Sequence, residues 1–348
     1  MNPMNSTWKK REALSVYMPK HLTTVLFFSF ILLIACIACS LIFGARTITW
    51  NELIAGVTFS GAESYGAGVV QERIPRTVFS LCCGAALGVS GALMQAVTRN
   101  PIADPSILGV NTGAALFVVM GLAFWNISTA GEYITVAIIG ALITAAFVYG
   151  IGSMGPAGAT PLKLVLAGAA TSAALSSLIS MIILPRGHIM DQFRFWQVGS
   201  VGSGSWDSIL TFLPILVIGV ILAIGSASAL NALALGDEVA TGQGVRTGIL
   251  RIIAAFAGVI LCGAATALAG PIGFIGLMST HFIRLLLGPD LRFIIPLSAM
   301  TGAILLTVAD ISGRLLGSPG ELEAGVVTAF IGAPLLIFLA VRMKVRSL

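Results

Sequence analysis

The chain contains few side chains that could carry covalent, redox or metal chemistry. Its cysteines all fall inside long apolar segments and are Cys36, Cys39, Cys82, Cys83 and Cys262. Cys36 and Cys39 have CxxC spacing, but no histidine or second cysteine pair stands near them to complete a tetrahedral site. We therefore expect these thiols to pack in the interior or against lipid, and we expect no metal site.

Ionisable groups within apolar segments are the other candidates, because such groups usually face a cavity or a partner. His281 lies one turn from Arg284, which fits a packed, hydrogen-bonded histidine near a helix end better than a transport role. His21 and His188 are expected in solvent at segment boundaries. Asp310 falls at a segment end, so the segment centres carry none of the carboxylates expected of a proton relay.

Three motifs of common enzymes are absent from the sequence. It has no G-x-x-x-x-G-K-[ST] loop for ATP phosphates, no H-E-x-x-H for zinc and no G-x-S-x-G nucleophile elbow. A membrane enzyme or an ion-coupled secondary transporter would lack working groups. The remaining interpretation is a pore that takes its energy from a partner, without catalytic residues or cofactors of its own.

The segments that position these groups are nine runs without Asp, Glu, Lys or Arg. A helix needs about 20 apolar residues to cross a bilayer, so eight runs each suit one crossing. The ninth holds 32 residues and is interrupted by Gly270-Pro271, which predicts two helices there and ten in all. The runs are 22–45, 77–98, 105–131, 133–162, 164–185, 208–236, 252–283, 293–309 and 324–341.

Composition agrees with an integral membrane protein, since 57% of the residues are hydrophobic and 9% are charged. We expect residues 1–348 to form one transmembrane domain. With ten alternating helices and both termini cytoplasmic, including residues 1–21, 13 of the 19 Lys and Arg residues lie inside. That bias follows the positive-inside rule. The net charge of +5 thus reflects topology, and we expect no nucleic-acid partner.

A faint internal repeat links two glycine-rich stretches. GAALGVSGALMQA (84–96) opens much like GAATALAGPIGFIGL (263–277), five helices later. An odd offset reverses the direction of the chain, so the pair predicts an inverted repeat of five plus five helices. Two Gly/Ala-rich helices that match by composition are the alternative.

Four long segments resemble a known family. They are ERIPRTVFSLCCGAALGVSGALMQAVTRNPIADPSILGV (72–110), LALGDEVATGQGV (233–245), GPIGFIGLMSTHFIRLLLGPDLR (270–292) and ELEAGVVTAFIGAPLLIFL (321–339). The chain is similar over residues 23–342 to FecCD-type permease subunits of type II ABC importers for iron-siderophores, haem and vitamin B12. The resemblance implies a ten-helix permease in the cytoplasmic membrane that works as a pair, of two copies or two related chains. ATPase subunits would bind it inside and a substrate-binding protein outside.

The resemblance also implies three groups of site residues. The cytoplasmic loop 231–247 would couple to the ATPase through Gly236, Asp237, Glu238, Gly242 and Gly244, a simple connector being the alternative. Arginines would dock the binding protein at Arg73, Arg76 and Arg314, unless the first two only anchor a helix end at the lipid head groups. A cytoplasmic gate would use Asn100, Ile102 and Thr160 from two Pro-rich loops, which could equally be plain turns.

The sequence departs from the family pattern at Thr241, which replaces a basic residue, and at Thr280 and Glu323, which replace prolines. We expect local differences in the coupling loop, in the eighth helix and at the start of the tenth. The expected function is the permease subunit of an iron-siderophore importer. Haem or vitamin B12 is the alternative cargo, and an ion-coupled secondary transporter is the alternative from another class.

Overall fold

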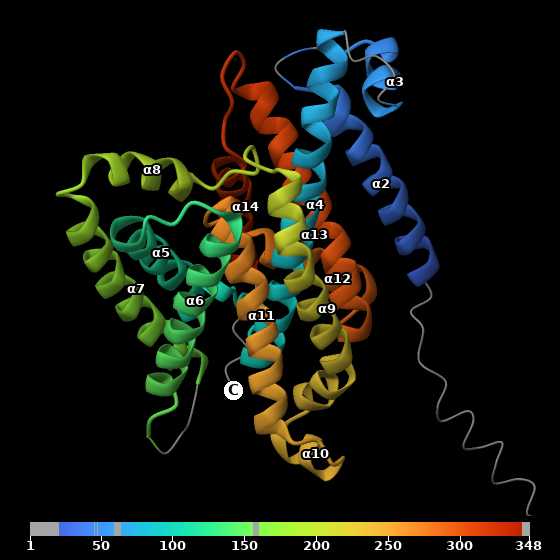
Figure 1. Ribbon diagram of the computed structural model, residues 1–348. Coiled ribbons are helices and arrows are strands. Elements are labelled where there is room, and N and C mark those ends of the chain that lie inside the picture. The colour runs from blue at the N-terminus through green and yellow to red at the C-terminus, as the bar shows by residue number, and fades with distance from the viewer. Residues whose placement is uncertain (1–20, 45, 47, 59–63, 156–159, 343–348) are drawn as a thin grey trace, which may run out of the picture.

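The computed structural model describes residues 21–342 apart from 45, 47, 59–63 and 156–159. All regular secondary structure in these residues is helical (Figure 1). The first six elements are α2 (Leu22–Ile42), α3 (Trp50–Thr58), α4 (Tyr65–Thr98), η1 (Pro105–Leu108), α5 (Val110–Met120) and η2 (Gly121–Trp125). The chain continues with α6 (Ala130–Gly152), α7 (Pro161–Ile183), α8 (Gly187–Val198), α9 (Trp206–Ala234) and α10 (Asp237–Gly242). It ends with α11 (Thr247–Ala269), α12 (Ile275–Leu287), α13 (Leu291–Leu316) and α14 (Ala324–Arg342).

The expected all-α membrane fold is confirmed, and every charge-free segment is helical over most of its length. Seven helices in the described part of the chain are long and apolar enough to cross a membrane, and Val110–Trp125, Ile275–Leu287 and Ala324–Phe338 are shorter apolar helices. The break predicted at Gly270-Pro271 is present, since α11 ends at Ala269 and α12 begins at Ile275. Gly270 has φ +73°, a backbone angle that glycine adopts without a steric penalty. The number of crossings and the inverted repeat stay predictions.

Local capping chemistry explains where several helices begin. Thr129 and Glu132 form a capping box at the start of α6, in which the Thr129 hydroxyl accepts from the Glu132 amide. Thr160 precedes α7 and accepts from the Lys163 amide, while Pro161 occupies the first helical position, where its missing N–H costs nothing. Asp290 caps α13 by accepting from the Arg292 amide.

Glycines allow α4 to approach α12 and α13 at backbone distance. A Cβ at Gly84 would lie 2.4 Å from the Gly302 carbonyl oxygen, and one at Gly88 would lie 2.1 Å from that of Ser298. At Gly91, a Cβ would lie 2.5 Å from the Gly276 Cα. Small residues at such crossings let membrane helices pack closely. The hydroxyls of Ser80 on α4 and Thr307 on α13 add a 3.0 Å hydrogen bond across this interface.

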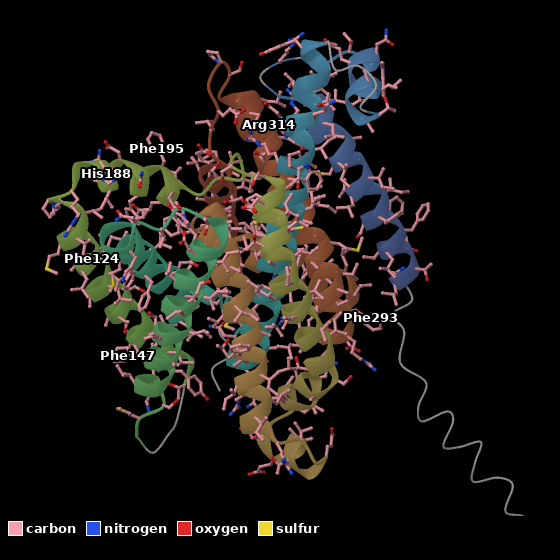
Figure 2. All side chains as sticks on the ribbon, in the orientation of Figure 1. Phe124, Phe147, His188, Phe195, Phe293 and Arg314 are labelled. Carbon is pink, nitrogen blue, oxygen red and sulfur yellow. The ribbon has the colours of Figure 1, made fainter. Side chains whose placement is uncertain are left out.

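The bundle has two distinct ends and an exposed periphery. In Figure 1, α10 lies at the lower end of the bundle, and α3 and α8 lie toward the upper end. Helices α3 and α8 were not predicted, because each carries charged residues and is too short to cross a bilayer. In α2 and in α7, only 11% of the most apolar 18-residue stretch is buried, so both helices face outward. Exposed aromatic side chains such as Phe124 and Phe147 lie on the outside of the α5–α7 region (Figure 2).

Candidate functional site

A charged cluster at the upper end joins α4 to α13 and to the α13–α14 loop. The Arg76 guanidinium donates to Asp310 from Nη2 at 2.6 Å and from Nε at 3.1 Å, and its Nη1 donates to Glu321 at 2.7 Å. Asp310 also forms an ion pair with Arg314 at 3.1 Å, and its side chain is 3% exposed. A buried carboxylate between two arginines has the countercharge that its burial requires.

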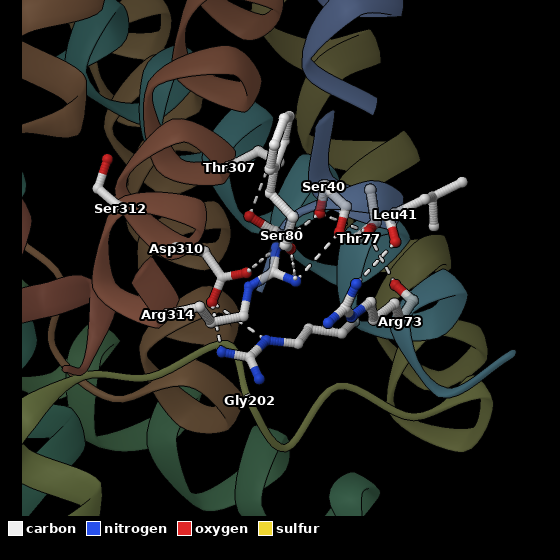
Figure 3. A network of polar contacts seen from close by, with 12 residues as sticks. Ser40, Leu41, Arg73, Thr77, Ser80, Gly202, Thr307, Asp310, Ser312 and Arg314 are labelled. Carbon is white, nitrogen blue, oxygen red and sulfur yellow. Dashed lines mark hydrogen bonds and ion pairs between the residues drawn. The ribbon is translucent and has the colours of Figure 1, made fainter. Parts of the chain in front are cut away.

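Arg73 and Arg314 bind the C-terminal end of α2 (Figure 3). Arg314 donates to the Ser40 and Phe43 carbonyl oxygens at 3.0 Å each, and Arg73 donates to those of Leu41 and Ile42 at 2.9 Å each. The last carbonyls of a helix have no partner within it and carry partial negative charge, so cationic donors stabilise that end. Two arginines from other helices therefore terminate α2.

Burial separates the predicted docking arginines. Arg73 is 8% exposed and Arg314 is 2% exposed, and both donate to main-chain carbonyls at the end of α2. Arg73 also donates to the Arg46 carbonyl, and Arg314 also pairs with Asp310. The Arg76 side chain is 16% exposed and faces the surface beside Glu321. The three predicted residues do lie in one region at the upper end, but only Arg76 presents its guanidinium to a surface cavity.

Two of the cavities that α8 helps to line contain polar side chains. One of about 490 Å³ is bordered by Arg76, Glu321 and Glu323 together with Trp196 and the serines of the α8–α9 loop. The other, of about 330 Å³, lies between α5, α7 and α8 and is lined mainly by amide, hydroxyl and aromatic side chains: Asn111, Thr112, Ser176, Ser180, Phe193, Trp196 and Gln197. Trp196 borders both cavities, and its indole Nε1 donates to the Ala267 carbonyl at 3.0 Å. Apolar side chains such as Ile179 and Ile183 complete the lining, and no charged side chain is part of it, so the cavity suits a ligand with both hydrogen-bonding and apolar groups.

At the lower end, the predicted coupling loop forms the short helix α10. Gly236 before it and Gly244 after it have φ of +120° and +82°, so both glycines have backbone angles that other residues adopt with strain. Asp237 Oδ1 accepts from Arg99 Nη2 and from Arg251 Nη2, the latter at 2.9 Å. Glu238 and Val239 are exposed, as is Gly242. The loop thus presents a small mixed surface, anchored by one acid.

The base of the same loop is held by Asn231 near the end of α9. Its amide Nδ2 donates to Asp290 Oδ1 at 2.6 Å, and its Oδ1 accepts from the Leu291 amide at 2.9 Å. Hydrogen bonding to the Arg292 side chain is the main cause that lowers the pKa of Asp290. The interaction with Asn231 also favours the ionised carboxylate.

The predicted gate residues lie in loops next to this end. Asn100 Oδ1 accepts from the Ile102 amide at 3.2 Å, closing the turn that leads into η1. Element η1 packs on α7, where a Cβ at Gly168 would lie 1.8 Å from the Ile107 carbonyl oxygen. Thr160 lies two turns earlier, at the start of α7. Residues 156–159 of the second predicted gate loop lie outside the described residues.

The intramembrane groups have packing roles here. Cys262 donates to Asn111 Oδ1 at 3.3 Å, and Arg284 donates to Gln95 Oε1 at 3.0 Å. Gln95 in turn donates to the Thr280 hydroxyl at 2.7 Å, so the threonine that replaces a family proline joins α12 to α4. Among the described residues, no group of three or more His, Cys, Asp or Glu could hold a metal ion.

Comparison with known proteins decides the family. The model of the FecCD transport family matches residues 32–342. The chain belongs to this family. The ferric enterobactin transport system permease protein FepD of Escherichia coli strain K12 is 42% identical over 318 residues, which are 91% of this chain and 94% of FepD. The siderophore transport system permease protein YfiZ of Bacillus subtilis strain 168 is 38% identical, over 89% of this chain and 93% of YfiZ.

A solved structure supports the same assignment. It is described as an inward-facing conformation of a metal-chelate type ABC transporter. Its chain superposes with a TM-score of 0.79 at 27% identity, covering 92% of this chain and 100% of that one. This chain is accordingly a multi-pass transport subunit of the FecCD family.

The sequence predicted the regions of the site but not the ion pairs and hydrogen bonds within it. Asp310 lies in the last two turns of α13, and its burial between Arg76 and Arg314 was not predicted. Arg73 and Arg314 donate to main-chain carbonyls of α2. Every residue has such a carbonyl, so the residue types could not indicate these acceptors. The one available signal was the absence of a basic residue in the last turn of α2.

Proposed function

We propose that this chain is the membrane permease of a binding-protein-dependent ABC importer, and that its cargo is a ferric siderophore. Partner subunits hydrolyse ATP, and a substrate-binding protein delivers the cargo from outside. The single observation that carries the proposal is the family match over residues 32–342, with relatives named for ferric enterobactin and siderophore transport. The chemistry of the chain supports it, because no ATP-binding loop is present in the sequence.

The proposed direction of transport runs from the α8 end to the α10 end. Both termini and the α10 loop are placed in the cytoplasm, as the excess of Lys and Arg on that side favours. The 330 Å³ cavity lies near the outer end, and its amide, hydroxyl and aromatic side chains suit the hydrogen-bonding edges of an organic chelate. An uncharged wall also lets such a cargo leave, because no strong ion pair has to break.

We assign the docking of the substrate-binding protein to the region of Arg73, Arg76 and Arg314, with Arg76 as the side chain that contacts the partner. Arg76 borders the cavity of about 490 Å³, and its side chain is 16% exposed. An arginine can bind a partner carboxylate in bidentate geometry. Its present partners, Asp310 and Glu321, make this an exchange of one carboxylate for another. Arg73 and Arg314 support the site by holding α2 in place.

Coupling to the ATPase is assigned to Gly236, Asp237, Glu238, Gly242 and Gly244, because α10 projects from the bundle and exposes Glu238 and Val239 (Figure 1). The gate is assigned to Asn100, Ile102 and Thr160 near the same end.

A second permease, either another copy or a related chain, is proposed to cover the exposed apolar faces of α7 and α14. Leu166 at 61% and Phe330 at 81% exposure belong to these faces.

Copurification tests the proposal most broadly. A tagged chain expressed from its native locus should bring down an ATPase subunit and a ferric chelate-binding protein, identified by mass spectrometry. Ligand analysis of the binding protein then distinguishes a siderophore from haem or vitamin B12. Recovery of the chain without any ATPase, together with proton-driven uptake by the chain alone, would contradict the proposal and favour a secondary transporter.

A further inference from the structure

One carboxylate at the lower end is shared between the coupling loop and two other helices. Asp237 is the first residue of α10, and its Oδ1 accepts from Arg99 at the end of α4 and from Arg251 in α11. Helix α10 packs on α9 and α11, and the ion pair with Arg99 reaches α4 as well. Asp237 is thus the point at which the α10 loop contacts the helix that leads into residues 100–105.

The Arg99 backbone is set in an unusual conformation. It forms the C-cap of α4 in the left-handed region, with φ 51° and ψ 33°, which residues other than glycine seldom adopt. The next residue, Asn100, donates its amide to the Gln95 carbonyl at 3.2 Å and accepts the Ile102 amide on its side chain. A shift of Arg99 therefore acts directly on the turn that holds Ile102.

This turn leads into η1, which packs against α7. The Ala103 amide donates to the Asn100 carbonyl at 3.0 Å, and Asp104 caps η1 through the Ser106 amide at 3.0 Å. Element η1 lies against α7 near Gly168, so its movement is limited by that contact. A continuous path of hydrogen bonds and residues adjacent in the chain runs from α10 through Arg99 to η1.

We infer that Asp237 is a positioning residue that transmits movement of α10 to the 100–105 loop through its ion pair with Arg99. This inference rests on the proposed function, since it requires an ATPase that moves α10. The glycines with positive φ on either side, Gly236 and Gly244, have nothing within 4 Å of a Cβ, so α10 can turn without steric hindrance there. The other ion pair of Asp237, with Arg251, holds α10 against α11.

The link is a weak one, which makes it testable without unfolding the protein. The Arg99 and Asp237 side chains are 37% and 45% exposed, and an ion pair in that setting changes an equilibrium by about two- to fivefold. Loss of the link should consequently reduce coupling by about that factor, while folding and assembly persist. A purely structural pair would leave coupling unchanged.

The test uses the complete importer in nanodiscs, with a single cysteine in place of Ile102 in a variant whose five native cysteines are replaced. Labelling of that cysteine by a water-soluble maleimide is measured without nucleotide and with ATP and vanadate. We expect labelling to depend on nucleotide in the reference protein. In Asp237→Asn and Arg99→Gln the dependence should fall about two- to fivefold while ATP hydrolysis continues, and Arg99→Lys should restore it.

Matched controls separate this link from general effects of charge. Arg46→Gln breaks another partly exposed ion pair, that with Glu52 at 3.3 Å near the opposite end of the bundle, and should leave the nucleotide dependence unchanged. Unchanged nucleotide dependence in both Asp237→Asn and Arg99→Gln would overturn the inference, as would an equal loss in Arg46→Gln. Absence of any nucleotide dependence in the reference protein would instead count against the proposed function.

Discussion

Replacing Arg314 by methionine should destabilise the fold. Arg314 is 2% exposed and donates to the Ser40 carbonyl and hydroxyl and to the Phe43 carbonyl, in addition to its ion pair with Asp310. Methionine fills a similar volume but donates nothing, so the end of α2 would lose these donors. Each buried acceptor left without a partner costs about 1–3 kcal/mol.

The expected loss is about 3–5 kcal/mol, the range for breaking one side of a buried ionic network. It is not larger, because Asp310 keeps its 2.6 Å contact with Arg76 and remains neutralised. Arg314→Lys should cost less, because lysine keeps the charge but cannot repeat the fork of donors. Arg194 on α8 is exposed, so Arg194→Met should stay within about 0.5 kcal/mol of the parent protein.

Unfolding by SDS in mixed micelles, followed by circular dichroism, measures these differences. The rate at which the buried thiols of Cys83 and Cys262 react with a fluorogenic maleimide gives an independent readout of opening. If Arg314→Met unfolds at the same SDS fraction as the parent while it loses affinity for the binding protein, Arg314 is a docking residue and the anchoring role is refuted.

Three further predictions follow from particular contacts. Gly88→Leu should destabilise by about 1–3 kcal/mol, because even a Cβ there lies 2.1 Å from a carbonyl of α13, whereas Gly225→Ala, with nothing within 4 Å, should be tolerated. Gly244→Ala should reduce ATP-driven uptake more than Gly242→Ala does, since φ is +82° at Gly244 and Gly242 is helical; equal effects in a transport assay would disprove the conformational argument. The pKa of Asp290 is lowered from 3.8, so its stabilising contribution is present above about pH 4 and is lost as pH falls through the folded value. The difference in SDS stability between the parent and Asp290→Asn should accordingly shrink between pH 5 and pH 3, and a constant difference would show that Asp290 keeps the same pKa on unfolding.

The helices of the bundle could be predicted from the sequence because lipid imposes a simple rule. Each membrane helix must be apolar over most of its length, and Gly270-Pro271 marks the break between α11 and α12. Helices α3 and α8 escaped this rule, since they lie at the upper end and carry charges such as Glu52 and Arg194. Amphipathic helices of about ten residues have no comparable signal.

The site was less predictable, because its contacts join residues far apart in the chain. Arg76 and Asp310 are 234 positions apart, and Arg99 and Asp237 are 138 positions apart. Residue types indicated which arginines matter, but not that Arg73 and Arg314 would bind main-chain carbonyls. Acceptors on the backbone are present at every position, so only the packing of α4 and α13 against α2 decides which ones are used.

The most direct test of the central claim is transport by the purified importer in proteoliposomes. The chain, its ATPase and its binding protein are reconstituted with ATP enclosed, and uptake of ⁵⁵Fe-labelled enterobactin or another ferric siderophore is measured with an ionophore present. The account predicts accumulation that requires ATP and the binding protein and persists without an ion gradient. Accumulation that needs a proton or sodium gradient and proceeds without ATP would contradict it.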